Sequence, residues 1–388
     1  MDADMKPGTD AGRKALGEAR GGACASCGEP YEGTDRFCER CGHPHACRIA
    51  VPRPEAGPGR CADCGAGAVG ADGYCDQCGL RQPSGREHLE AELKGDAGPP
   101  SAAAVTDVGS RRARNEDAFA LVALPQAVCG VVCDGVATAP GSEEAAWLAA
   151  GTAARVLAGR LAAGMSPHLA MRTAAVLAGE AVASLPGSGA PGDPRGRPAC
   201  TFVSAIVQDG GVTVGWIGDS RAYWLAGPEG GSRLLTRDDS WAVRMIARGT
   251  MSAADAWADR RAHLLTAWLG TGAGLLDPHV TAFRPGGPGL VLICSDGFWN
   301  DLPDASAIAA VARTGTNTPA GPDPDMDVGA DPFADPLAVA RRLVRAALDA
   351  GGHDNVTVAA IPFPPHGPDG ASTGGTEPSL TEFREPGP

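Results

Sequence analysis

Short apolar runs that meet an aspartate are the most informative pattern in this chain. Residues 128–133 form one such run before Asp134, and residues 290–294 form another shortly before Asp296. Asp354 stands just before a third run. Each run predicts a buried strand, and a glycine follows the first two aspartates and permits a sharp turn. Because an unpaired buried carboxylate is costly, these strand ends predict one cation site built of oxygen ligands.

Helical periodicity between the strands predicts a mixed domain. We expect helices where apolar residues recur at helical spacing, over residues 143–163, 167–185, 241–248, 253–268 and 337–349. Alternation over 201–207 and 212–217 predicts a β-hairpin. Segments rich in glycine and proline predict loops at 186–198 and 315–336. Strands before and after pairs of helices predict an α+β domain.

Cysteines are concentrated in the first eighty residues, in a unit that occurs twice. Each unit has two Cys-x-x-Cys pairs ten residues apart, and the second unit follows the first at a spacing of thirty-seven positions. The eight cysteines are Cys24, Cys27, Cys38, Cys41, Cys61, Cys64, Cys75 and Cys78. Four thiolates at this spacing suit tetrahedral zinc, and the units resemble bacterial double zinc ribbons. The sequence therefore predicts two structural Zn²⁺ ions, without which such small units would not fold.

A disulfide framework is the alternative for these cysteines. We predict zinc because residues 1–20 are polar and have no signal-peptide core, whereas disulfides persist mainly in oxidising compartments. Cys47 lies outside the repeat and is expected to be a spare thiol in a linker. We expect four other cysteines to be small core residues, because they fall in apolar runs: Cys129, Cys133, Cys200 and Cys294.

Charge and hydropathy limit the classes of partner. The formal net charge of −13 argues against a nucleic-acid or membrane surface as the partner. Acidic residues in the ribbons also offset their few arginines, which disfavours a nucleic-acid-binding ribbon protein. Apolar runs stay shorter than the roughly 18 residues of a transmembrane helix. We therefore expect a cytoplasmic protein that binds neither nucleic acid nor membrane.

Five motifs occur in a fixed order and resemble those of a known family. They are Thr106-Asp107-x-Gly109-x-x-Arg112-x-x-Asn115-Glu116-Asp117, Asp134-Gly135, Gly218-Asp219-Ser220-Arg221-Ala222-Tyr223, Ser295-Asp296-Gly297 and Asp354-Asn355. Together they look like the metal-dependent Ser/Thr protein phosphatases of type 2C, in their bacterial form, over about residues 102–362. The resemblance implies two stacked antiparallel β-sheets flanked by helical pairs, an αββα sandwich with metals at one end.

The resemblance implies a binuclear site of Mn²⁺ or Mg²⁺ that activates water to hydrolyse phosphomonoesters. Asp134 would be the catalytic, bridging carboxylate, and the carbonyl of Gly135 would bind one of the two metals. Asp296 and Asp354 would hold the other metal. Both ions prefer oxygen ligands and retain several waters, which fits a site with few carboxylates.

Further residues gain roles from the same resemblance. Asp117, with Glu116, would orient water on the Gly135 side, and Asp219 would bind a looser third metal. Arg112 would act in catalysis by holding the substrate phosphate in a bidentate, charge-assisted pair. Taken alone, the cluster around Arg112 would be interpreted as a solvated turn.

Two positions depart from the family pattern. Family members often carry histidine where Asp239 stands. In some members a histidine just after the Asp-Gly is the general acid, whereas residues 136–139 here are Val-Ala-Thr-Ala. We therefore expect the leaving group to be protonated by metal-bound water or another group, and we interpret His353 as a turn residue.

The sequence predicts five regions and one favoured function. The regions are a disordered segment (1–20), a double zinc ribbon (21–82), a linker (83–102), a phosphatase domain (103–362) and a disordered tail (363–388). We expect a phosphatase that acts on phosphorylated proteins, opposite Ser/Thr kinases, with ribbons that dock an unknown protein partner or regulate activity. The alternative is a catalytically weak scaffold whose ribbons bind proteins. Retention of Asp134, Asp296 and Asp354 favours the enzyme.

Overall fold

The structure is a computed structural model. It describes residues 22–24, 27, 29–31, 37–42, 44–53, 60–67, 69–70, 73–94, 100–187, 196–227, 230–314 and 333–364. The predicted disordered segment 1–20, most of the predicted tail and most of the 315–336 loop lie outside these residues. The chain divides into two units, residues 1–46 and 47–388, and each is described by itself.

The first unit contains the first cysteine repeat. Strand β1 (Gly22–Ala23) pairs with β2 (Pro30–Tyr31) in a two-stranded antiparallel sheet. An isolated bridge joins Phe37 to Pro44 around the second Cys-x-x-Cys pair.

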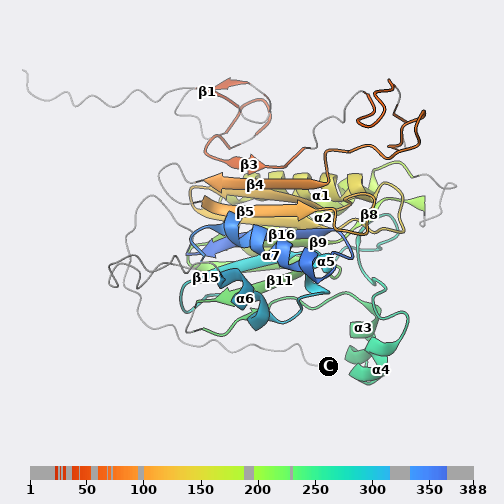
Figure 1. The fold of residues 1–388 in the computed structure, drawn as a ribbon. Helices are drawn as coiled ribbons and strands as arrows, with labels where there is room; N and C mark the ends of the chain where they lie inside the picture. Colours follow the sequence, from red (N-terminus) through yellow and green to blue (C-terminus); the bar gives the residue numbers. More distant parts are fainter. Residues whose placement is uncertain are drawn as a thin grey trace, which may run out of the picture. The chain divides into compact units, whose positions relative to one another are not determined.

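Two six-stranded antiparallel sheets form the body of the second unit (Figure 1). The first sheet has the order β14 (His279–Phe283), β10 (Gly211–Ile217), β9 (Phe202–Gln208), β7 (Ala127–Cys133), β6 (Ala118–Leu124), β3 (Arg48–Ala50). The second has the order β12 (Arg233–Leu234), β11 (Arg221–Ala226), β15 (Gly289–Cys294), β16 (Val356–Phe363), β5 (Pro100–Asp107), β4 (His88–Lys94). A short pair, β8 (Ala199–Cys200) with β13 (Leu269–Gly270), completes the strands described.

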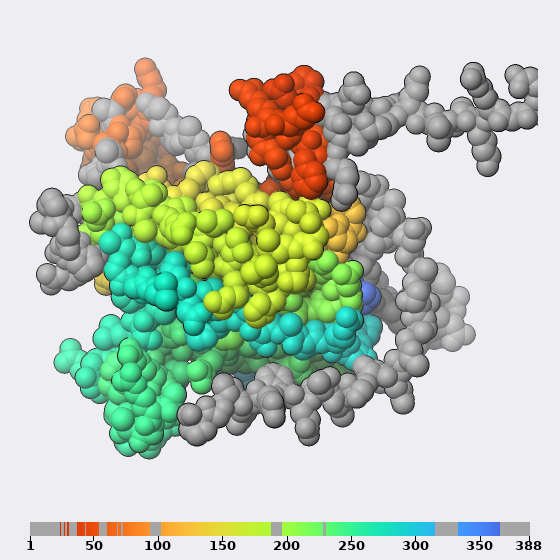
Figure 2. Space-filling model, turned by 180° about the vertical axis from the view of Figure 1, so that it is seen from behind, coloured from red at the N-terminus to blue at the C-terminus, as the bar shows by residue number. Residues whose placement is uncertain are grey.

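Helices cover the outer face of each sheet. Helices α1 (Ser142–Ala162) and α2 (Pro167–Ala183) pack on the first sheet and form much of the surface in Figure 2. Helices α5 (Asp296–Trp299), α6 (Ala305–Arg313) and α7 (Pro336–Ala350) pack on the second sheet. The predicted αββα sandwich is therefore confirmed, and the predicted helices 143–163, 167–185 and 337–349 match within two residues.

Alternation along β7 shows how the layers are held together. Cys129 and Val131 point into the core shared with α1 and α2, whereas Val128 and Val132 point into the core between the sheets. Successive side chains of a strand face opposite sides, so a strand in the middle layers needs apolar residues at every position. This is why its sequence is a continuous apolar run.

The predicted linker 83–102 is partly wrong, because residues 88–94 form β4 beside β5. Leu89, Ala91 and Leu93 face the core between the sheets, and polar residues alternate with them. The strand is an edge strand with a charged outer face, so its composition resembled that of a linker. Cys47 is likewise buried in the core beside α1, not a spare thiol in a linker.

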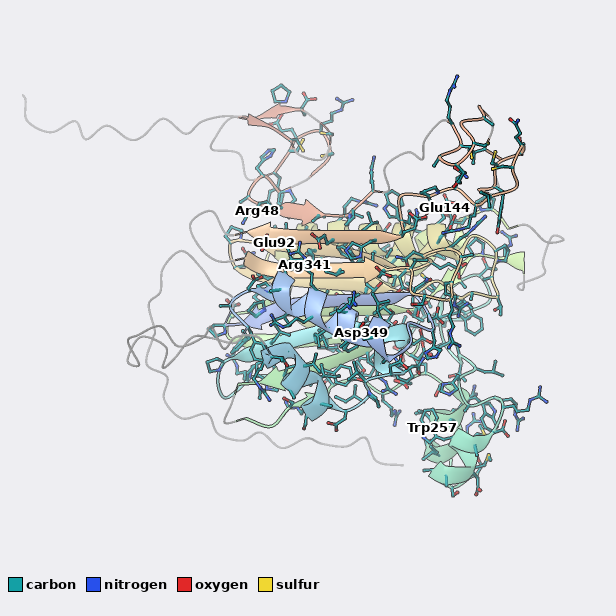
Figure 3. All side chains as sticks on the ribbon, in the orientation of Figure 1. Arg48, Glu92, Glu144, Trp257, Arg341 and Asp349 are labelled. Carbon is teal, nitrogen blue, oxygen red and sulfur yellow. The ribbon has the colours of Figure 1, made fainter. Side chains whose placement is uncertain are left out.

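The predicted helix 253–268 is too long. Helix α3 (Trp241–Ala247) is followed by α4, which spans only Ala253–Ala258. The helix ends there because Asp259 takes an extended conformation and accepts hydrogen bonds from Arg261. Figures 1 and 3 show α3 and α4, with Trp257, standing away from the two sheets.

Membrane insertion finds no support in these helices. Among the described residues, none of the helices is both long and apolar enough to cross a bilayer.

The assignment of β4 can be tested with Leu93. Leu93→Ala should lower the free energy of unfolding by about 2–4 kcal/mol, because the side chain is buried between the sheets. Chemical denaturation measures this value. Leu275→Ala is the control, since Leu275 is 97% exposed and should change stability by less than about 0.5 kcal/mol. Equal stabilities would contradict the place of β4 in the core.

Candidate metal centre and active site

One cavity of about 650 Å³ collects most of the predicted site residues. It is lined by Arg112, Glu116, Asp134, Gly135, Asp219, Asp296 and Asp354, among others. Asp117 is buried and does not line this cavity, but its carboxylate accepts a hydrogen bond from the hydroxyl of Ser295, the residue before Asp296. Residues from five motifs far apart in the sequence are thus brought together.

Asp134 is fixed by the backbone at the end of β7. Its amide donates to the hydroxyl of Thr201 at 3.1 Å, and its carbonyl accepts from the amide of Thr201 at 2.8 Å. Burial raises the pKa of the Asp134 carboxyl well above its usual range, and the nearby charge of Asp117 raises it further. The carboxylate is held at a place where its charge needs a cation.

Gly135 permits a close approach of three segments. A Cβ at this position would lie 2.7 Å from the carbonyl oxygen of Glu116 and 2.8 Å from that of Ser142. The Ser142 hydroxyl also donates to a carboxylate oxygen of Glu116 at 2.7 Å. The absence of a side chain therefore brings the Glu116 turn and the start of α1 against the end of β7.

Asp296 and Asp354 meet because of a second close approach. Asp296 begins α5, and Gly297 follows it with its Cα packed against the turn before β16. A Cβ on Gly297 would lie 2.1 Å from the carbonyl oxygen of Asn355. Burial and the charge of Asp354 raise the pKa of Asp296. Arg112 forms an ion pair with Asp354, so the predicted phosphate ligand contacts a predicted metal ligand.

Asp117 has one satisfied oxygen and one without a partner. Its Oδ2 accepts hydrogen bonds of 2.7 Å from the hydroxyls of Ser295 and Thr357. Its Oδ1 is buried and has no hydrogen-bond partner among the residues that the structure describes. Burial raises the pKa of Asp117 to about 7. A buried carboxylate oxygen without a donor, on a carboxyl group that feels the charges of other aspartates, fits a site for a hydrated divalent cation.

Sequence reasoning missed the hydroxyls that hold Asp117. Thr357 is a polar residue at a fully buried position of the apolar strand β16, and Ser295 stands directly before Asp296. A hydroxyl in an otherwise apolar strand was the available signal. The contact itself joins residues 240 positions apart, so local pattern alone does not reveal it.

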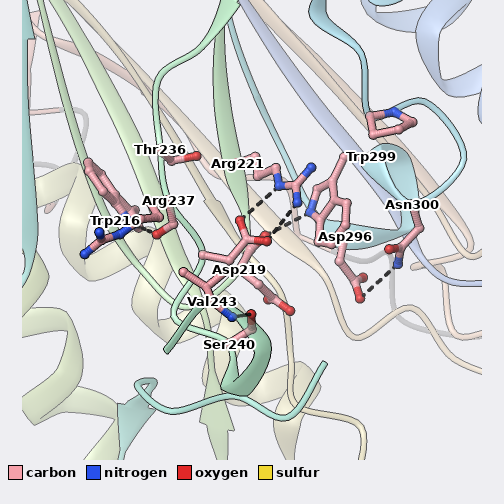
Figure 4. Close-up of polar contacts among 12 residues, drawn as sticks. Trp216, Asp219, Arg221, Thr236, Arg237, Ser240, Val243, Asp296, Trp299 and Asn300 are labelled. Carbon is pink, nitrogen blue, oxygen red and sulfur yellow. Dashed lines mark hydrogen bonds and ion pairs between the residues drawn. The ribbon is translucent and has the colours of Figure 1, made fainter. Parts of the chain in front are cut away.

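The backbone of Asp219 is held by Trp299 of α5 (Figure 4). The indole N–H of Trp299 donates to the Asp219 carbonyl at 2.8 Å, and the guanidinium of Arg221 lies 3.5 Å from the centre of the Trp299 ring. Asp238 binds Arg221 through both carboxylate oxygens, at 2.9 and 2.8 Å. Burial and the charge of Asp296 raise the pKa of the Asp219 carboxyl.

Asp239, where family members often have histidine, has a defined role in this fold. One carboxylate oxygen accepts from the amide of Gly218 at 2.9 Å, and the other lies 2.9 Å from Nε2 of His279. That hydrogen bond raises the pKa of His279. The histidine of this pair lies on β14, and the pair supports the turn before Asp219.

Other residues shape the rest of the cavity. Its remaining wall includes Arg197, His263 and an apolar group made of Val136, Ala137, Leu264, Leu265 and Trp268. His353, interpreted as a turn residue, lies 3.6 Å from a carboxylate oxygen of Asp301. The cavity therefore combines carboxylates, two arginines and an apolar surface.

The cysteines form two four-thiol clusters, and within each cluster the sulfurs lie within 4.8 Å of one another. Paired Sγ–Sγ distances are 3.5–3.6 Å in the first ribbon and 3.6 Å in the second. A disulfide needs about 2.05 Å, whereas tetrahedral zinc with 2.3 Å bonds separates sulfurs by about 3.8 Å. None of the thirteen cysteines, all within the described residues, forms a disulfide. The clusters fit tetrathiolate zinc, and the alternative of disulfides does not.

The packing at Gly297 gives a testable prediction. Gly297→Ala should weaken Mn²⁺ binding about tenfold or more and lower stability by about 1–3 kcal/mol, because the new methyl group would push the Asn355 carbonyl away. Calorimetry and denaturation measure the two effects. Gly159→Ala is the control: nothing lies within 4 Å of its Cβ, and alanine should stabilise α1 by about 0.5–1 kcal/mol.

The buried aspartates also predict how pH affects the metal-free protein. Their pKa values are higher when folded than when unfolded, so the folded state retains protons that the unfolded state has lost. Stability from these protons is full below about pH 4 and disappears as pH rises through about 7, the pKa of Asp117. In the presence of a chelator, the thermal midpoint should be lower at pH 8 than at pH 5. Asp117→Asn should reduce this dependence of the midpoint on pH. A midpoint that rises over this range would contradict it.

Comparison with known proteins places this cavity in a family. Residues 109–327 match the family model described as Protein phosphatase 2C. The PPM Ser-Thr phosphatase MsPP from Mycobacterium smegmatis, solved in complex with cacodylate, is 30% identical to this chain. That match covers 68% of this chain and 99% of MsPP, with a TM-score of 0.51.

Two further bacterial structures share the fold. The serine/threonine phosphatase PstP/Ppp of Mycobacterium tuberculosis is 23% identical over 67% of this chain and 97% of its own, with a TM-score of 0.50. The serine/threonine phosphatase of Staphylococcus aureus is 21% identical over 70% of this chain and 98% of its own, with a TM-score of 0.52. A comparison with curated proteins gave no match. Because the family model spans more than half of its residues, this chain belongs to the protein phosphatase 2C family of phosphoprotein phosphatases.

Proposed function

We propose that this chain hydrolyses phosphoserine and phosphothreonine in proteins through a binuclear centre of Mn²⁺ or Mg²⁺. The buried Oδ1 of Asp117, which has no hydrogen-bond partner among the described residues, supports this proposal most directly, because the charges of Asp296 and Asp354 act on the same carboxyl group. When bound, two such cations compensate the phosphoryl charge and make water a nucleophile at neutral pH.

The carboxylates divide between the two cations by position. Asp134, at the centre of the cluster, would be shared by both ions, and the Gly135 carbonyl would bind one of them. Asp296 and Asp354, held together by the glycine contact, would bind the other. All these donors are oxygens, as hard divalent cations prefer.

Three further residues would complete the centre. Asp117, with Glu116, would orient water on the Gly135 side, and one oxygen of Asp117 has no hydrogen-bond partner among the described residues. The Ser142 hydroxyl holds the carboxylate of Glu116, which limits its rotation. Asp219 would bind a more weakly held third cation. Its backbone carbonyl accepts a hydrogen bond from the indole of Trp299.

Arg112 would orient the substrate phosphate. Asp354 holds its guanidinium at the rim of the cavity, through one terminal nitrogen. An arginine has five N–H donors in a planar arrangement, so the remaining edge can meet two phosphate oxygens. The ion pair therefore positions Arg112 for the substrate before it binds.

The zinc ribbons would act as a docking or regulatory module. Their cysteines form closed four-ligand sites, which leave no position for a substrate. The expected substrates are phosphoproteins made by Ser/Thr kinases, and MsPP is described as a Ser-Thr phosphatase. The ribbon partner would be another protein.

Metal removal and Asp134→Asn test the proposal together. Chelation should abolish release of phosphate from a phosphothreonine peptide, and Mn²⁺ or Mg²⁺ should restore it where Zn²⁺ does not. Asp134→Asn should lower turnover about a hundredfold or more, because an amide cannot bridge two cations. Asp209→Asn makes the same change in the β9–β10 turn and should be neutral.

Two results would overturn the proposal. One is hydrolysis by the wild type without any divalent metal, and the other is full activity of Asp134→Asn. A wild-type protein that binds Mn²⁺ but hydrolyses no phosphoester would favour the alternative of a scaffold with protein-binding ribbons.

A further inference from the structure

We propose that the second zinc ribbon controls metal binding at the catalytic centre, through a bridging segment of residues 82–87. The first ribbon lacks this role. The inference rests on the proposed binuclear centre and gives the regulatory function of the ribbons to one of them.

The two ribbons are attached to the chain in different ways. The first belongs to residues 1–46, a unit separate from the sandwich. The second, which spans Cys61–Cys78, lies between β3 and β4 in the sequence. Strand β3 pairs with β6 in the first sheet, and β4 pairs with β5 in the second sheet. The second ribbon therefore lies between a strand of the first sheet and a strand of the second sheet, and residues 82–87 connect it to the latter.

Gln82 makes the bridging segment part of the ribbon. Its side chain is buried, its Oε1 accepts from the amide of Ala62 at 2.6 Å, and its Nε2 donates to Asp63 at 3.0 Å. Its own amide donates to the carbonyl of Gly73 at 2.7 Å. These partners lie in both halves of the ribbon, so the position of Gln82 depends on a folded ribbon.

Arg86 and Glu87 bind the bridging segment to residues near the catalytic centre. The Arg86 carbonyl accepts from the side-chain amide of Asn115 at 3.1 Å. Its guanidinium donates to the carbonyl of Glu143 at 3.2 Å, in the first turn of α1, where Figure 3 labels the next residue, Glu144. The carbonyl of Glu87 accepts from Val108 at 2.7 Å. Three contacts thus hold one short segment against the first motif and the start of α1.

Asn115 connects Arg86 to the buried Asp117 through hydrogen bonds. Its Oδ1 accepts from the amide of Asp117 at 3.2 Å, and its Nδ2 donates to the hydroxyl of Thr106 at 2.9 Å. Thr106 lies 2.6 Å from the hydroxyl of Thr357, which donates to Asp117. The side chain of Asn115 is buried, so each of these hydrogen bonds is costly to lose.

Arg86 is also connected to Glu116, through Glu143 and its neighbour Ser142. Glu143 follows Ser142, whose hydroxyl holds the Glu116 carboxylate. Arg86 therefore touches the neighbours of both Asp117 and Glu116, although its own side chain does not line the cavity. It is a positioning residue, and its order depends on zinc in the second ribbon.

Loss of zinc from the second ribbon should weaken metal binding at the catalytic centre. A ribbon of this size needs zinc to fold, so zinc loss should release Gln82 and then Arg86. Asn115 would lose a buried acceptor, and the carboxylates that it positions would become less ordered. Coupling between two such sites is reciprocal, so Mn²⁺ in the cavity should strengthen zinc binding by the same factor, about fivefold or more.

The repeat provides a matched pair of variants. Cys41→Ser and Cys78→Ser replace the fourth, exposed cysteine of the first and second ribbon. Each should remove one zinc equivalent from the full chain, as measured by elemental analysis. Cys78→Ser should raise the Mn²⁺ dissociation constant in calorimetry about fivefold or more, and Cys41→Ser should change it less than twofold.

A second pair avoids any change in the cysteines. Arg86→Ala should retain both zinc ions yet weaken Mn²⁺ binding, because only the contact to Glu143 is lost. Arg155→Ala, on the exposed side of α1, is its control. If Cys78→Ser unfolds the sandwich, the Mn²⁺ dissociation constant of Arg86→Ala tests the coupling instead.

The outcomes separate this inference from the proposed function. If the wild type fails to bind Mn²⁺ or to hydrolyse a phosphothreonine peptide, the binuclear centre itself is wrong. If the wild type does both, but Cys78→Ser matches Cys41→Ser and Arg86→Ala matches Arg155→Ala, the coupling alone is overturned.

Discussion

Repulsion among desolvated carboxylates is the constraint on which this structure depends. Burial raises the pKa of Asp117, Asp134, Asp219 and Asp296, and the charges of neighbouring aspartates raise it further, so the cluster is costly to ionise when no cation is present. Rigid strand ends keep these groups together despite the cost in stability. The same proximity gives the cavity its chemistry, because a cluster that is unfavourable alone becomes favourable with divalent ions.

The surrounding packing explains how the cluster is kept from relaxing. Gly135 and Gly297 let backbones approach so closely that a methyl group would not fit. Hydroxyls, an asparagine and the Trp299 indole then hold the carboxylates or their backbone in place.

The catalytic motifs could be predicted from the sequence because each is local. Asp134 and Asp296 follow apolar runs that identify buried strands, and the cysteine repeat identifies the ribbons without any structure. The partners of Asp117 could not be predicted in this way, because Ser295 and Thr357 reach it only when the second sheet forms. Strand β4 was missed because an edge strand with charged residues on one face has the composition of a linker. Helix α4 was overextended because its end depends on Asp259, which leaves the helical conformation without a glycine or proline nearby.

The two strands from the ribbon region also protect the sandwich from other chains. Strand β3 covers one edge of the first sheet, and β4 covers the corresponding edge of the second. Without them, β6 and β5 would present unpaired amides and carbonyls along apolar strands, which are templates for intermolecular pairing. Proteolysis between the second ribbon and β5 would thus weaken the barrier to self-association. The N-terminal region thus covers the longer apolar strands at both sheet edges, apart from any effect on catalysis.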